Sequence, residues 1–311
     1  MPLKASSRAK TCRTKSPAAV FRRTPRGVSL RVAGLQILLA DVSSPSDPLF
    51  SRPHLGGFLG SEPTPPGIVL RRAASVRPSS QPTLQGYRTG SGTRTRVTLG
   101  QFYRVRVNPD SRRPISMEVR ERATRLDVVL PHTTYSDILT AILVGLAQEL
   151  PRRSGLLLHA SAARFGNGVV VFPGGSGAGK STAAHSFPPD QVIADERTAI
   201  RHSGQGWYAW SVPLLSEKYG MVKPADGPLK LIGIIQKNRS PSVRRIPSTD
   251  AVRALLGAVL CHHLDEASAD RVLGVIVNLV RVIPVYQVAC RAGDSVAELL
   301  HSSLGDGQLD R

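Results

Sequence analysis

The chain has 311 residues, enough for one large domain or two small ones with a substantial core. It is 41% hydrophobic and 20% charged, with three scattered cysteines, so a disordered chain and a cysteine-ligated metal site are both excluded. No apolar run approaches the roughly 18 residues of a membrane span. We therefore expect a cytoplasmic protein that does not span a membrane, and its oligomeric state stays open.

The net charge of +19 is unusually basic, and it is unevenly distributed. Residues 1–27 contain eight Lys or Arg and no acidic residue, so this tail supplies +8 of the total and is expected to be disordered. Only 5% of residues are aromatic, and no nucleic-acid-binding motif is present. We interpret the remaining charge as a solvated, arginine-rich composition and do not expect a nucleic-acid partner.

The first half of the chain has strand-like patterns. Residues 28–42 alternate and then become continuously apolar, which predicts one or two strands. Residues 43–95 are rich in Ser, Pro, Gly and Arg, so we expect a long irregular segment with one strand candidate at 68–70. Further strands are predicted at 97–107, 115–119 and 126–130.

The second half alternates helices and strands. Ser136 is the expected cap of a helix that ends at Pro151, and a strand follows at 156–159. Later strands are predicted at 192–194, 207–211, 229–236 and 283–290, and helices at 249–262, 267–280 and 294–303. The prediction is an α/β or α+β fold on a mixed sheet, with a basic tail (1–27), a β-rich N-terminal portion (28–150) and a core (151–311).

The most informative stretch is FGNGVVVFPGGSGAGKSTAA, residues 165–184. Four apolar residues lead into Gly174-x-x-x-x-Gly179-Lys180-Ser181, which is a complete Walker A phosphate-binding loop in a strand–loop–helix context. Glycines let backbone N–H groups surround a phosphate, the lysine neutralises its charge, and the serine hydroxyl is placed to bind Mg²⁺. The predicted phosphate-binding residues are Gly174, Gly175, Ser176, Gly177, Ala178, Gly179, Lys180, Ser181 and Thr182.

Two further segments flank this loop. Val192-Ile193-Ala194 runs into Asp195-Glu196, the Walker B pattern of an apolar strand that delivers a carboxylate to Mg²⁺. The alternative for Asp195 is an ion pair with Arg197. His159 ends an apolar strand that we expect to form a hairpin with 169–172, which would bring it toward the nucleotide; otherwise it is a histidine satisfied within the sheet edge.

The run LLLHASAARFGNGVVVFPGGSGAGKSTAA, followed by VIADE, resembles the HPr kinase/phosphorylase family, and especially its diverged kinase-like relatives. The resemblance implies a P-loop kinase core related to the phosphoenolpyruvate carboxykinases, which uses ATP and Mg²⁺ to phosphorylate a Ser or Thr hydroxyl of a protein or peptide. It assigns the metal to Ser181 and Asp195, the base to Glu196, and a role beside the transferred phosphoryl group to His159. The family has Asp-Asp at the acidic pair, so Glu196 departs from its pattern.

Other readings of the same residues stay open. The family's segments for carrier-protein recognition and phosphorolysis are not found, and a loop at 217–228 could serve as a lid or an acceptor groove. The protein could instead be a small-molecule kinase, a carboxykinase-like enzyme, or a nucleotide-binding regulatory module without turnover. His262 and His263 are adjacent on a predicted helix, so they point apart, and we interpret them as surface residues.

Overall fold

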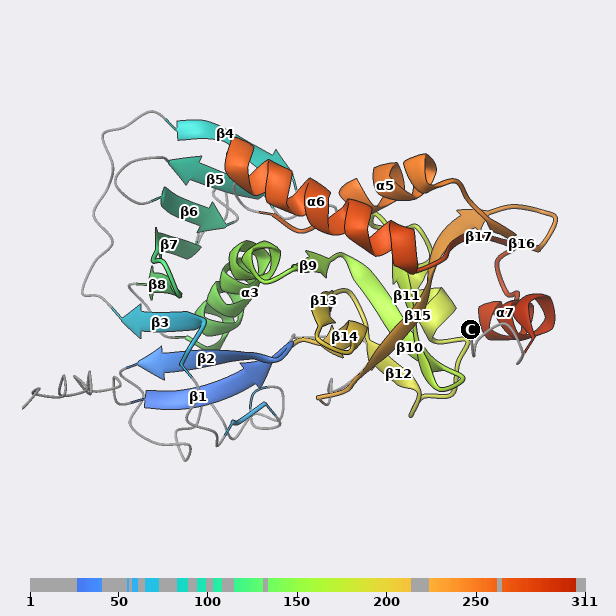
Figure 1. Cartoon of the computed structure of the whole chain (residues 1–311), viewed down its shortest axis with the longest axis horizontal. Helices are drawn as coiled ribbons and strands as arrows, with labels where there is room; N and C mark the ends of the chain where they lie inside the picture. The colour runs from blue at the N-terminus through green and yellow to red at the C-terminus, as the bar shows by residue number, and fades with distance from the viewer. Residues whose placement is uncertain are drawn as a thin grey trace, which may run out of the picture.

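The computed structural model describes residues 27–40, 55, 58–60, 65–72, 83–88, 94–98, 103–107, 115–130, 134–213, 224–261 and 265–305. The fold is α+β, with two large mixed sheets and few helices (Figure 1). Strands β1–β8 form one sheet, and β9–β17 form a second. Buried apolar residues of both sheets belong to one core cluster. Within the described ranges, no helix combines the length and apolar character that a membrane crossing requires.

The first sheet has eight strands in the order β1-β2-β3-β8-β7-β6-β5-β4. Its central strands are buried on both faces: Ile37, Leu39 and Met117 belong to the main core, whereas Leu38, Ala40 and Val69 form a smaller buried cluster. The strands are β1 (Gly27–Val32), β2 (Leu35–Ala40), β3 (Ile68–Arg72), β4 (Thr83–Arg88), β5 (Arg94–Thr98), β6 (Tyr103–Val107), β7 (Ile115–Glu121) and β8 (Leu126–Leu130).

Helix α3 (Tyr135–Arg152) packs on the inner face of this sheet. Its cap is Thr134, which forms a capping box with Asp137, so the prediction that Ser136 caps the helix is wrong by two residues. Pro151 lies inside the last turn rather than ending the helix. The apolar cluster around α3 also includes residues of the second sheet, so the core is continuous across residue 150.

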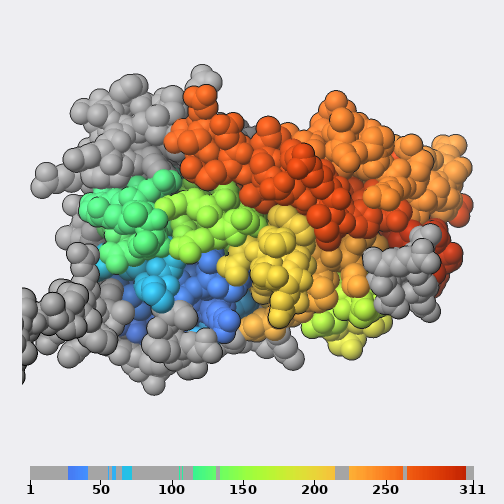
Figure 2. Space-filling model, in the orientation of Figure 1, coloured from blue at the N-terminus to red at the C-terminus, as the bar shows by residue number. Residues whose placement is uncertain are grey.

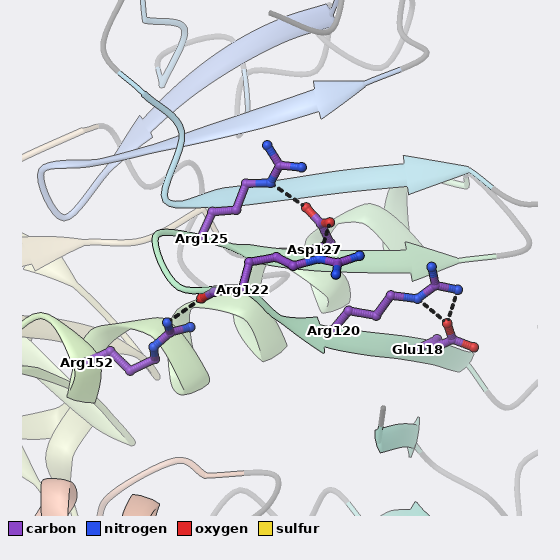
Figure 3. A network of polar contacts seen from close by, with 6 residues as sticks. All are labelled: Glu118, Arg120, Arg122, Arg125, Asp127 and Arg152. Carbon is purple, nitrogen blue, oxygen red and sulfur yellow. Dashed lines mark hydrogen bonds and ion pairs between the residues drawn. The ribbon is translucent and has the colours of Figure 1, made fainter. Parts of the chain in front are cut away.

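Part of the arginine excess is used in ion pairs on the β7–β8 hairpin (Figure 3). The buried carboxylate of Asp127 pairs with Arg125 at 2.9 Å and with Arg122 at 3.4 Å. Glu118 is also buried and pairs with Arg120. A buried carboxylate requires such partners, so these arginines have a structural use beyond solubility.

The second sheet follows the order β12-β10-β11-β15-β14-β13-β9, with β17 beside β15 and β16 beside β17. Helices α5 and α6 cover one face, and α4 and α7 cover the other. The strands are β9 (Gly155–Leu158), β10 (Ala160–Phe165), β11 (Gly168–Pro173), β12 (Val192–Ala194), β13 (Thr198–Ser203), β14 (Gly206–Ser211), β15 (Asp226–Lys237), β16 (Ser242–Arg245) and β17 (Val285–Cys290). The helices are α4 (Lys180–Ala184), α5 (Ser248–Leu256), α6 (Glu266–Val282) and α7 (Val296–Leu304).

Several local predictions need correction. The hairpin partner of β11 is β10, not the strand predicted to end at His159. Strand β9 ends at Leu158 and pairs with β13, and a separate strand, β10, begins at Ala160. Strands β4, β13 and β16 were not predicted, and β4 lies in the segment expected to be irregular. Helix α5 was predicted to end at residue 262, but it ends at Leu256 and Gly257 is its C-cap. His262, His263 and most of the 217–228 loop lie outside the described residues.

Candidate functional site

The glycine-rich loop connects the end of β11 to the start of α4. Gly177 and Gly179 have φ angles of +77° and +96°, in the left-handed region that favours glycine. A Cβ atom on Gly179 would also stand 3.3 Å from Cγ2 of Ile235 on β15. Glycine is therefore required at this position both by backbone conformation and by the approach of a neighbouring strand.

Lys180 is the first residue of α4, and its side chain turns back across the loop. Its ammonium group donates a hydrogen bond to the carbonyl oxygen of Gly175 at 2.9 Å, and only 4% of the residue is exposed. Burial lowers the pKa of Lys180, while the negative charges of Glu196 and Asp195 act in the opposite direction. The loop thus holds a cation whose charge is poorly compensated by solvent.

Asp195 follows β12 and is the polar centre of the site. Its Oδ1 atom accepts hydrogen bonds from the Ser181 hydroxyl at 2.7 Å, the Ser161 hydroxyl at 2.9 Å and the Glu196 amide at 3.0 Å. Its Oδ2 atom is buried and has no hydrogen-bond partner in the described part of the chain, and Nε2 of His185 lies 3.6 Å from it.

Asp195 forms no ion pair with the Arg197 side chain within the described part of the chain. Its carboxylate accepts hydrogen bonds from two hydroxyls and an amide, and none from the Arg197 side chain. A buried carboxylate oxygen without a donor, beside a serine hydroxyl, suits a hard cation such as Mg²⁺, which prefers oxygen ligands. Within the described ranges no group of three His, Cys, Asp or Glu residues could hold a metal, so phosphate oxygens and water would have to complete the coordination.

Glu196 lies beside His159, with 3.3 Å between Oε2 and the histidine Nε2. The histidine side chain is buried, whereas the glutamate side chain is 46% exposed. The hydrogen bond from His159 is the main cause that lowers the pKa of Glu196; the positive charges of His159, Lys180 and Arg197 add to it, and burial opposes them. Glu196 is therefore ionised at neutral pH.

The backbone around this pair is constrained. Glu196 has a φ angle of +72°, an unfavourable conformation for a residue with a side chain, which costs on the order of 1–3 kcal/mol. The His159 amide donates to the Ala258 carbonyl at 2.8 Å, and the His159 carbonyl accepts from the Gly174 amide at 3.1 Å. His159 thus links the site to the first residue of the glycine-rich loop, although it is not in the predicted hairpin.

A cavity of about 950 Å³ opens in front of these residues. One wall consists of the loop and helix residues Ser176–Thr182 together with Glu196. The second wall contains Lys237 at the end of β15, Asn238 and Arg239 after it, and the segment 291–294 after β17. Gly174, Gly175, Asp195 and His159 are not part of the cavity surface, and Asp195 and His159 lie behind Ser181 and Glu196.

Sequence reasoning missed the second wall. Lys237, Arg239 and Arg291 are not among the predicted site residues, although all three line the cavity. The available signal was topological: β11, β15 and β17 are neighbouring parallel strands, of which β15 and β17 end at this cavity and β11 leads into the loop that lines it. Ligands of such sheets bind at the carboxyl ends of the strands, so the residues that follow them were candidates.

No protein-family model matches this chain, and no curated protein is significantly similar to it in sequence. The function of the site must therefore be inferred from its own residues and geometry.

Proposed function

We propose that the protein is an ATP-dependent phosphotransferase with a P-loop kinase core of the HPr kinase type. The observation that carries this proposal is the common location of Lys180, Ser181 and Glu196 on one cavity, with Asp195 hydrogen-bonded to Ser181 at 2.7 Å behind it. A phosphate-binding loop, a metal-ligating pair and a carboxylate are the components that phosphoryl transfer needs. The cavity also has the cations Lys237, Arg239 and Arg291 on its second wall, which suits a polyphosphate.

The residues divide into three roles. The loop amides and Lys180 bind the phosphates, because the left-handed glycines open the backbone and the ammonium is held at the loop. Ser181 and Asp195 would hold Mg²⁺, which would supply positive charge to neutralise the phosphates of the nucleotide. Ser161 donates to Asp195 from the buried side and so positions the carboxylate without touching the ligand.

In the transfer step, the oxygen of an acceptor hydroxyl forms a bond to the terminal phosphorus of ATP while the bond to the β-phosphate oxygen breaks, and ADP leaves. Glu196 accepts the hydroxyl proton, since it is ionised and lies on the cavity surface. His159 orients this carboxylate through its Nε2 contact. We propose a Ser or Thr of a protein or peptide as acceptor, on the resemblance alone.

The test separates binding from transfer. Binding of a fluorescent ATP analogue with Mg²⁺ is measured for the full chain and for Lys180→Ala, in which we expect about 10- to 100-fold weaker affinity because a charge-assisted contact is lost. Release of ADP is then measured for Glu196→Gln, with Glu266→Gln as an exposed control at the start of α6. Loss of the base should lower turnover by about 10²- to 10⁴-fold without weakening ATP binding.

A nucleotide-binding regulatory module is the second candidate, and one observation favours it. The contact with His159 lowers the pKa of Glu196, and a carboxylate with a lowered pKa is a weaker proton acceptor. This candidate predicts tight Mg·ATP binding with no phosphoryl transfer in the unaltered protein. Turnover that needs a small hydroxyl compound rather than a peptide would instead favour a small-molecule kinase or a carboxykinase-like enzyme.

A further inference from the structure

A second hollow lies between the two sheets, away from the phosphate-binding loop. The β1–β2 hairpin, the end of α3 and the β13–β14 hairpin enclose two adjoining cavities of about 710 Å³ and 590 Å³. In Figure 2 the blue β1–β2 hairpin adjoins the yellow β13–β14 hairpin along this boundary. Both cavities are lined by Arg31, Gly34, Leu59, Arg201 and Ser203, so they form one groove, which we call the inter-sheet groove.

Arg201 of β13 is the central side chain of the inter-sheet groove. Its guanidinium carbon lies 5.7 Å from the centre of the Trp210 ring, in cation–π geometry. Its Nη2 atom lies close to the β1–β2 turn, only 2.8 Å from where a Cβ atom on Gly34 would stand. The guanidinium is thus fixed between an aromatic ring and a turn, and no carboxylate within the described ranges lies within ion-pair distance of it.

Two further guanidinium groups lie near Arg201. Burial lowers its pKa, and the nearby guanidinium groups of Arg153 and Arg31 lower it further. Arg153 lines one of the two cavities and is held by Glu149 at 2.9 Å and by the Thr124 carbonyl at 2.8 Å. Asp226 lines the other but forms no ion pair with Arg201. A half-buried guanidinium near like charges is unfavourable unless an anion joins it.

We propose that the inter-sheet groove binds a small organic anion, whose carboxylate or phosphate group pairs with Arg201 and whose remaining atoms pack on Trp210 and Tyr208. Guanidinium matches the geometry of both oxyanions, since its planar fork can donate two parallel hydrogen bonds. The two rings lie 5.6 Å apart at an angle of 33°, so they form an apolar wall beside the cation. No residue of the inter-sheet groove lines the cavity of about 950 Å³ at the glycine-rich loop. The groove is therefore a separate site, independent of the proposed kinase activity.

The test uses the fluorescence of Trp210 in the full chain. The sequence has only two tryptophans, Trp207 and Trp210, so Trp207→Phe leaves a reporter inside the inter-sheet groove. Inorganic phosphate and succinate are titrated separately to distinguish the phosphate from the carboxylate form of the ligand. We expect a saturable fluorescence change with at least one of them, weakened by about 10- to 100-fold in Arg201→Met, which keeps the apolar packing but loses the charged contact.

Two control variants locate the signal. Arg281→Met alters an exposed arginine near the end of α6 and should leave the titration unchanged. Lys180→Ala removes the cation of the other cavity and should also leave it unchanged. If Arg201→Met does not fold, Arg31→Met removes the second guanidinium common to both cavities and should weaken binding. No saturable change with either anion, an unchanged titration in a folded Arg201→Met, or loss of the signal in Lys180→Ala would each overturn the proposal.

Discussion

Ser161 offers the sharpest test of how the site is held together. Its side chain is fully buried on β10 and donates a 2.9 Å hydrogen bond to Oδ1 of Asp195, which is itself 4% exposed. In Ser161→Ala that oxygen loses one of its three donors, in a place where water does not replace it. Hydrogen bonds to charged groups contribute about 1.5–3 kcal/mol, so we expect a loss of that size in the free energy of unfolding.

The matched variant is Ser181→Ala, which removes a second donor to the same oxygen from a half-buried position on the cavity. It should have the smaller effect on unfolding, because solvent can replace its hydroxyl, and the larger effect on Mg·ATP affinity. Urea unfolding and nucleotide titration of both variants measure the two quantities. If Ser161→Ala had the same midpoint of urea unfolding as the wild type, the argument that this hydroxyl holds the carboxylate would be refuted.

Three further predictions concern pH and backbone conformation. Because the Glu196 pKa is lowered chiefly by His159, the acid limb of the pH–activity profile should lie below the ordinary glutamate value of 4.5, and His159→Gln should move it upward. Burial raises the pKa of Glu149, so its contribution to stability is fully present below pH 4.5 and is lost as pH rises through the folded-state pKa; unfolding of Glu149→Gln measured across this range should lack that slope. Gly179→Ala should unfold more easily by about 1–3 kcal/mol, since alanine is strained at φ +96° and would press on Ile235; an unchanged melting temperature would contradict this.

The predicted sheet and helices are confirmed where the signal is local. The strands at 192–194 and 207–211, the short helix after the loop and the long α6 all stand near the predicted positions. These elements could be predicted because the periodicity of their own apolar residues, or residues within one turn of their ends, indicates where they lie. The prediction failed at His159, because nothing in the local sequence shows that residues 155–165 are divided there into β9 and β10, which pair with different strands.

The loop from Gly174 to Ser181 and the acidic residue that follows β12 could be predicted as a candidate site from the amino-acid order, because each is a short segment whose chemistry depends on fixed local spacing. What only the folded chain decided is which distant residues meet them. Ser161 reaches Asp195 across 34 positions, and Arg239 and Arg291 form a wall because three parallel strands end at the same edge. Strand pairing between remote segments depends on the packing of the whole core, and a local pattern does not contain that information.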